Sequence, residues 1–147
     1  MEGKVSLVTG ASRGIGKGVA MKLAEHGSDI AFTYLSSDEK AKEVEDELKA
    51  FGVKAKGYKS NAADYAAAEE LIKNVLADFE KVDAVVNNAG ITRDGLLMRM
   101  TEENWDEVMN TNLKSVYNVT KHIQRSMLKQ RSGSISKSAI ALHSCHP

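Results

Sequence analysis

The chain has 147 residues, one cysteine, and 20 Lys plus Arg against 20 Asp plus Glu, which suits one domain with a substantial core and excludes an internal disulfide. The zero net charge argues against nucleic acid or an anionic membrane as a partner. With no basic-then-apolar leader and no apolar run of membrane-spanning length, the sequence predicts a cytoplasmic protein without a membrane segment.

The first part of the sequence alternates between expected strands and helices. Gly27 and Gly52 are natural helix ends, and Ser36 or Ser37 and then Asp64 are natural helix starts. Strands are expected at Lys4–Thr9, Asp29–Tyr34, Val53–Tyr58 and Val82–Val86, and helices at Gly16–His26, Asp38–Phe51 and Asp64–Phe79. This rhythm predicts an α/β, Rossmann-like doubly wound parallel sheet with helices on both faces.

A long helical region is expected from about Thr101 to Gln130. Asn112 falls on its apolar stripe, where an amide costs stability unless it is hydrogen-bonded. Either a neighbouring carbonyl satisfies Asn112 at a kink, or the amide holds a water or a catalytic side chain. The stripe, expected to be buried, consists of Trp105, Val108, Met109, Leu113, Val116, Tyr117, Ile123, Met127 and Leu128.

The stretch from Thr9 to Gly16 reads as the end of a strand, a tight glycine turn and the first turn of a helix. Backbone N–H groups and the positive end of the helix dipole make such a turn a site for phosphate. The spacing G-x-x-x-G-x-G differs from the commonest dinucleotide fingerprint. A tight strand-to-helix connection that binds no ligand is the alternative.

Three motifs in order resemble the short-chain dehydrogenase/reductase family: the glycine turn, Asn87-Asn88-Ala89-Gly90, and Asn110-Thr111-Asn112-Leu113. The segment Ile91–Met100 is most similar to the 3-oxoacyl-[acyl-carrier-protein] reductases of that family. The resemblance runs from about Lys4 to Ile135, so residues 1–135 are expected to form an NAD(P)-binding domain cut near the start of its fifth strand. Residues 136–147 are expected to be an irregular tail.

The resemblance implies a role for each matching residue. Asn112 becomes the member of a catalytic tetrad that holds a proton-relay water. The cofactor would contact Gly10, Ser12, Arg13, Gly14, Ile15 and Gly16 at the pyrophosphate, Ser36 after the second strand, Asn61 and Ala62 at the adenine, and Asn88, Ala89, Gly90 and Ile91 on the nicotinamide side.

The residues at the end of the second expected strand favour NADP(H) as the cofactor. An NAD site usually places an acid there for the ribose 2′-hydroxyl, but this chain has no acid before Asp38. Arg13 in the glycine turn can reach the same ribose and bind a 2′-phosphate. The alternative is that Arg13 is an ordinary exposed turn residue.

The family's Tyr-x-x-x-Lys pair is expected beyond the fifth strand, and the chain stops before it. Ile140 stands where the family's serine is expected, and no spacing supports Ser138 or Ser144 as a substitute. Tyr117 and Lys121 fit the pattern but precede that strand, so Tyr117 is interpreted as a core aromatic. His143, Cys145 and His146 lack the usual paired metal-ligand spacing, and no metal site is predicted.

A basic stripe of Lys121, Arg125, Lys129 and Arg131 lies toward the end of the long helical region. These cations either complement the helix dipole or dock an acidic acyl carrier protein, a partner that the resemblance implies through Lys129 and Arg131. Family members are expected to be homo-oligomers, and a sheet with a bare edge is expected to self-associate.

Three functions are compatible with the sequence. The first is NADPH-dependent reduction of a 3-oxoacyl thioester in fatty acid synthesis, with this chain as the N-terminal part. The second is reduction of another carbonyl by a related reductase. The third is nucleotide binding without catalysis, which the missing tyrosine and lysine favour for this polypeptide alone.

Overall fold

The computed structural model describes residues 1–138, and it confirms the predicted fold class. Five parallel strands lie in the order β3-β2-β1-β4-β5. The strands are β1 Val5–Val8, β2 Asp29–Tyr34, β3 Ala55–Lys59, β4 Ala84–Asn87 and β5 Ser134–Lys137, and the helices are α1 Gly14–Glu25, α2 Asp38–Lys49, α3 Tyr65–Phe79, α4 Glu102–Met109 and α5 Ser115–Gln130. A short 3₁₀ turn, Leu97–Arg99, precedes α4.

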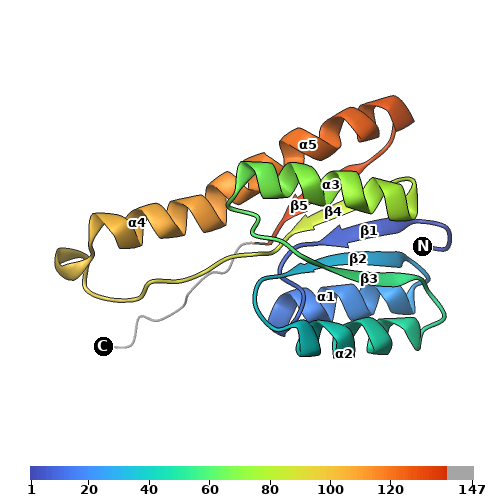
Figure 1. The fold of residues 1–147 in the computed structure, drawn as a ribbon, viewed down its shortest axis with the longest axis horizontal. Helices are drawn as coiled ribbons and strands as arrows, with labels where there is room; N and C mark the ends of the chain where they lie inside the picture. Colours follow the sequence, from blue (N-terminus) through green and yellow to red (C-terminus); the bar gives the residue numbers. More distant parts are fainter. Residues whose placement is uncertain (139–147) are drawn as a thin grey trace.

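Helices cover the two faces of the sheet in separate layers. Helices α1 and α2 lie on one face, and α3 and α5 lie on the other (Figure 1). Apolar strand residues alternate between the two cores: Leu7 packs in the core under α3 and α5, and Val8 in the core under α1 and α2. Ser37 caps α2 and Asp64 caps α3 through their side-chain oxygens, which fixes where both helices start.

The burial expected for the long helical region is wrong for four of the nine residues of its stripe. Ile123 and Met127 are buried, but Trp105, Leu113, Tyr117 and Leu128 are all more than half exposed. One reason is the π-helical turn Asn110–Lys114 between α4 and α5: its extra residue changes the phase between the two helices, so one count at a constant period does not describe both. The other reason is that α4 projects beyond the sheet (Figure 1).

Strand β5 forms an exposed edge of the sheet. It pairs with β4 in parallel, with Ile135 opposite Val85 and Lys137 opposite Asn87. All four of its residues are exposed. Ser136 and Lys137 therefore extend the sheet by two residues into the segment expected to be an irregular tail, and residues 139–147 lie outside the described part of the chain.

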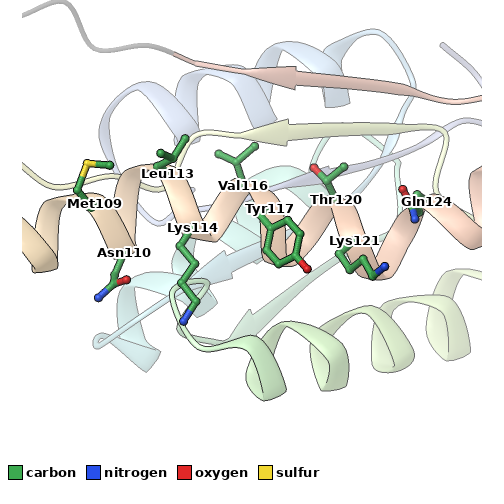
Figure 2. A pocket seen from close by; sticks show the side chains of 9 residues that line it. All are labelled: Met109, Asn110, Leu113, Lys114, Val116, Tyr117, Thr120, Lys121 and Gln124. Carbon is green, nitrogen blue, oxygen red and sulfur yellow. The ribbon is translucent and has the colours of Figure 1, made fainter.

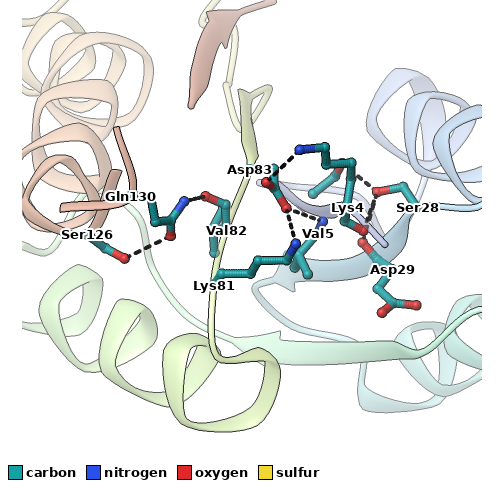
Figure 3. A network of polar contacts seen from close by, with 10 residues as sticks. Lys4, Val5, Ser28, Asp29, Lys81, Val82, Asp83, Ser126 and Gln130 are labelled. Atoms are coloured by element: carbon teal, nitrogen blue, oxygen red, sulfur yellow. Dashed lines mark hydrogen bonds and ion pairs between the residues drawn. The ribbon is translucent and has the colours of Figure 1, made fainter. Parts of the chain in front are cut away.

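A carboxylate anchors the start of β4 to β1 (Figure 3). Asp83 Oδ2 accepts from the Val5 N–H at 2.9 Å, and Asp83 Oδ1 lies 3.3 Å from the Lys4 ammonium. Burial alone raises the pKa of Asp83, but the Val5 hydrogen bond and the ammonium groups of Lys4 and Lys81 outweigh it. The pKa of Asp83 therefore lies below its ordinary value of 3.8.

We expect Asp83→Asn to lower the free energy of unfolding by about 1 kcal/mol at pH 7, because the amide keeps the Val5 contact but loses the charge. A lowered carboxylate pKa contributes stability above the ordinary pKa and loses it as the pH falls through the folded value. The difference between the two proteins should therefore shrink below pH 3.8. Urea unfolding across this pH range measures it, with the exposed Asp106→Asn as control. A difference independent of pH would contradict the assignment.

Candidate functional site

The carboxyl ends of β1, β2, β3 and β4 open into a cavity of about 380 Å³. In a doubly wound sheet this edge is where ligands bind. The cavity is lined by every residue predicted to contact the cofactor except Gly16, namely Gly10, Ser12, Arg13, Gly14, Ile15, Ser36, Asn61, Ala62, Asn88, Ala89, Gly90 and Ile91. Residues from four separate segments of the sequence therefore meet at one place.

The glycine turn requires glycine for two different reasons. Gly10 has a φ of +67°, and a Cβ there would lie 2.9 Å from the Ala89 Cα. Gly16 is buried beneath the cavity, where a Cβ would overlap the Gly10 carbonyl and the Asn88 amide nitrogen. The backbone can thus turn tightly and α1 can start close to the sheet.

The N-terminus of α1 faces this cavity without a side-chain cap. Arg13 occupies the cap position in an extended conformation, and neither its side chain nor an acidic residue satisfies the first turn. A helix start leaves several N–H groups unbonded, and these groups favour an anion. The turn therefore presents donors and a positive dipole end to the cavity.

Two threonines hold the turn in place, and no pattern in the sequence predicts a role for either of them. Thr9 Oγ1 accepts from the N–H groups of Asn88 and Ala89, each at 3.0 Å. Thr33 Oγ1 accepts from the Gly10 N–H at 3.0 Å. Asn88 completes the junction, because its Nδ2 donates to the carbonyls of Thr9 and Gly10. The Asn88 amide nitrogen is thus committed to the protein itself.

The cavity ends near β2 at a cluster of polar and cationic side chains. Arg13, Ser36, Ser37 and Lys40 all line it, and Lys40 was missed because its position one turn into α2 carries no signal in the sequence. Asp38 does not line the cavity.

The carboxylate of Asp38 is engaged elsewhere. It lies 3.3 Å from the Lys59 ammonium. Burial raises the pKa of the Tyr34 phenol, and the hydrogen bond between that phenol and Asp38 raises it further. The first acid after β2 is therefore paired with a cation and a phenol.

Asn112 is satisfied by the backbone of one residue on a neighbouring loop. Its Oδ1 accepts from the Ile91 N–H at 2.7 Å, and its Nδ2 donates to the Ile91 carbonyl at 2.8 Å. The residue lies within the π-helical turn and is half-buried. A neighbouring carbonyl does satisfy the Asn112 amide, as in the first interpretation: it is that of Ile91, in the loop at the cavity, and the helical region has a π-helical turn at this point.

Comparison with known proteins identifies the family to which the chain belongs. The family model for short chain dehydrogenases matches residues 4–139. The chain belongs to the short-chain dehydrogenase family.

Relatives within the family include 3-oxoacyl-[acyl-carrier-protein] reductases. The reductase of Staphylococcus epidermidis is 50% identical over 132 residues, covering 90% of this chain and 54% of the relative. That of Salmonella typhimurium is 46% identical over 134 residues, covering 91% and 53%. The chain thus spans about half the length of the curated relatives it matches.

A solved structure of a short chain dehydrogenase from Burkholderia cenocepacia, in complex with NADP, is also similar. It has a TM-score of 0.89 at 34% identity, and the match covers 99% of this chain and 59% of that one. A putative short-chain alcohol dehydrogenase from Sinorhizobium meliloti has a TM-score of 0.88 at 30% identity, covering 93% and 54%.

A second cavity, of about 410 Å³, adjoins the nicotinamide end of the predicted short-chain dehydrogenase site. Asn112, Trp105, Lys137 and Ser138 are among its lining residues. Within residues 1–138, it holds no tyrosine. Ile140 and Ser144 lie outside the described residues, so the structure gives no position for the residue that stands where the family has its serine.

Tyr117 and Lys121 lie in a different place. They line an open groove of about 530 Å³ along α4, the π-helical turn and α5, which we call the α5 groove (Figure 2). This groove contains none of the residues predicted to bind the cofactor. The interpretation of Tyr117 as a core aromatic is wrong, because 56% of the residue is exposed. Neither Tyr117 nor Lys121 lines either of the two cavities, which agrees with the prediction that this pair is not the catalytic pair.

The basic stripe lies on the exposed side of α5. Lys121, Arg125, Lys129 and Arg131 are exposed, and none forms an ion pair with another residue of the described range. Arg131 ends the helix in a left-handed conformation, with a φ of +54°. These side chains are thus placed for either the helix dipole or an acidic partner.

No helix in the described range is long and apolar enough to cross a membrane. In the same range, no three His, Cys, Asp or Glu side chains come together in a group that would hold a metal ion. His143, Cys145 and His146 lie beyond residue 138, where the structure gives no placement.

Proposed function

We propose that the chain supplies the NADPH-binding half of a cytoplasmic reductase that converts a 3-oxoacyl thioester, carried on acyl carrier protein, to the 3-hydroxyacyl form. The single observation that carries the proposal is the cavity at the sheet edge, where the glycine turn, the Asn61 loop and the Asn88–Ile91 loop meet. The similarity to 3-oxoacyl-[acyl-carrier-protein] reductases over 90% of the chain supports the substrate class.

The residues present fit a dinucleotide phosphate. The uncapped start of α1 and the turn at Gly14, where a Cβ would meet nothing within 4 Å, leave backbone N–H groups open to a pyrophosphate. Arg13, Ser36 and Lys40 offer donors for a 2′-phosphate, and Asp38, held by Lys59, does not oppose it. We therefore propose NADP(H) over NAD(H).

The loops at the other end of the cavity would hold the nicotinamide. When bound, the cofactor supplies the hydride for carbonyl reduction. Asn112 holds the backbone of Ile91 at both its N–H and its carbonyl, so two hydrogen bonds position this end of the cavity. We propose that Asn112 also orders the proton-relay water that the family resemblance implies, since each amide oxygen has a second lone pair.

We propose acyl carrier protein as the partner at Lys129 and Arg131. Both cations are exposed at the end of α5 and form no ion pair within residues 1–138, so they are available to an acidic surface. Complementing the helix dipole uses the same side chains, and the two roles are compatible.

Nucleotide binding without catalysis is the second candidate for the polypeptide of these 147 residues. The observation that favours it is the second cavity, which has no tyrosine among its described lining residues. Both candidates require that NADPH binds. Calorimetric titration with NADPH tests this common step, and the absence of binding at millimolar cofactor would overturn both.

We expect the purified chain to self-associate. Leu113 and Tyr117 are more than half exposed in the α5 groove, and within residues 1–138 one edge of β5 is unpaired. Other chains commonly cover such features. We propose that a second copy of the chain occupies the groove, as in a homo-oligomeric reductase.

Light scattering should therefore give a mass above the 16.0 kDa monomer that rises with concentration. Leu113→Lys should lower the mass, whereas Leu97→Lys, at a residue 79% exposed but outside the groove, should not. A monodisperse monomer that melts cooperatively would overturn the proposal.

A further inference from the structure

The side chain of Asn118 is buried in α5 without all of its hydrogen bonds. The residue is 0% exposed. Its Nδ2 donates to the Ala62 carbonyl at 2.9 Å, and its Oδ1 has no hydrogen-bond partner among residues 1–138. An amide in the core with an unpaired oxygen costs stability relative to an apolar side chain of similar size. Packing alone therefore does not account for an asparagine here.

The partner of Asn118 belongs to the loop predicted to hold the adenine. Ser60, Asn61, Ala62 and Ala63 line the cavity at the sheet edge. Local bonds set the shape of this loop, since Asn61 Oδ1 accepts from the Ala63 N–H and the Asn61 carbonyl accepts from the Asp64 N–H, each at 3.0 Å.

These local bonds, and the hydrogen bond from Ser60 Oγ to the Ala67 carbonyl, tie the loop to the start of α3 but not to the neighbouring helix α5. Helix α5 runs beside α3 on that face of the sheet (Figure 1). The hydrogen bond from Asn118, which is 56 positions from Ala62 in the sequence, makes that link. The same helical region holds the opposite end of the cavity, because Asn112 binds both backbone groups of Ile91.

We infer that Asn118 is a positioning residue for the cofactor: it holds the Ser60–Ala63 loop where the adenine half of the dinucleotide binds, as Asn112 holds the Ile91 loop at the nicotinamide half. This inference rests on the proposed binding of NADPH. On this inference, the amides of Asn112 and Asn118, both in one helical region, together set the distance between the two ends of the cofactor site.

Asn118→Leu is the informative variant, because leucine keeps the volume and removes the amide. The substitution eliminates the unpaired Oδ1 but leaves the Ala62 carbonyl without its donor, so the two stability effects oppose one another. We expect the Tm to shift by no more than about 4 °C. Thr120→Val is the matched control: within residues 1–138 it removes another buried, unpartnered oxygen of α5, at a residue that does not line the cavity.

Calorimetry on the full chain with adenosine 2′,5′-bisphosphate, which contains the adenine half alone, and with NADPH measures the effect. In Asn118→Leu the Kd for both ligands should rise by roughly 5- to 30-fold at unchanged stoichiometry. Partial unfolding would instead lower the stoichiometry. Asn112→Ala should weaken NADPH but not the bisphosphate, and Thr120→Val should change neither.

Amide hydrogen exchange of residues 60–64 tests the tether in the absence of any ligand. Faster exchange there in Asn118→Leu, but not in Thr120→Val, is the expected result. If the unmodified chain binds neither ligand, the proposed function fails, and the exchange measurement still decides whether Asn118 holds the loop. If the unmodified chain binds and Asn118→Leu binds equally well, the positioning role is refuted and the proposed function stands.

Discussion

The chain should bind NADPH at least about tenfold more tightly than NADH, and Arg13→Ala should remove most of that difference. A guanidinium can donate two hydrogen bonds to a phosphate, and a hydrogen bond to a charged group contributes about 1.5–3 kcal/mol, where 1.4 kcal/mol is tenfold in affinity. NADH lacks the 2′-phosphate, so its affinity should change by less than about twofold in the variant.

The same calorimetric titrations can separate charge from geometry at this end of the cavity. Arg13→Lys keeps the charge but loses the paired donors, so it should bind NADPH with intermediate affinity. Lys40→Ala tests the second cation that lines the cavity. The preference should also weaken with added salt, because both cations are exposed and therefore screened.

Two results would contradict the assignment of Arg13. One is an unmodified chain that binds NADPH and NADH equally. The other is an Arg13→Ala variant that binds NADPH as tightly as before. In the second case, Lys40 and the serines would carry the 2′-phosphate, and Arg13 would be the ordinary turn residue of the alternative interpretation.

The sequence predicted the α/β layers because each element in residues 1–87 carries its own local signal. Ser37 and Asp64 are cap residues, and Gly27 and Gly52 have positive φ at the helix ends. These signals act within one turn of the chain and do not depend on distant contacts. The positions of the glycine turn and of the Asn88 loop at one sheet edge followed from the parallel topology.

The π-helical turn at Asn110–Lys114 could not be predicted from the stripe, which places Tyr117 in the core. Tyr117 is exposed, whereas Asn118 is buried. A constant period counted through Asn112 omits the extra residue of a π-helical turn, so it does not give the phase of α5. The bond that favours this turn joins Asn112 to Ile91, 21 residues away, and no local pattern encodes it.

Thr9, Thr33 and Lys40 were missed for a similar reason. Thr33 lies in β2 and Thr9 directly follows β1; both are ordinary buried β-branched residues, and only their contacts with Gly10, Asn88 and Ala89 give them a role. Such contacts between loops depend on the final positions of three strand ends. They become visible only when the sheet is assembled.

The polypeptide of 147 residues, purified alone, should not reduce 3-oxoacyl thioesters at an enzymatic rate. Hydride delivery to a carbonyl builds negative charge on its oxygen, and an acid and hydrogen-bond donors must meet that charge. General acid catalysis contributes roughly 10²–10⁴-fold, and the loss of one oxyanion donor costs on the order of 10²–10³-fold. A site without these groups loses most of its catalytic advantage.

The described nicotinamide end of the cavity offers few such groups. The amide nitrogens of Asn88 and Asn112 already donate to the protein backbone. Tyr117 and Lys121 lie in the α5 groove, outside both cavities. Among residues 1–138, Lys137 and Ser138 are the cation and the hydroxyl nearest in sequence to the expected serine, and both line the second cavity.

Loss of NADPH absorbance with an acetoacetyl thioester measures the rate, and the unmodified chain should stay at the background level even where calorimetry shows that the cofactor is bound. Turnover well above that background would refute the prediction, and three variants would then identify its source. If Lys137→Ala abolished the activity, the second cavity would contain a substitute donor. If Tyr117→Phe or Lys121→Ala abolished it, the pair on α5 would have to reach the cofactor in another arrangement, such as a second copy of the chain placing its α5 groove against this cavity.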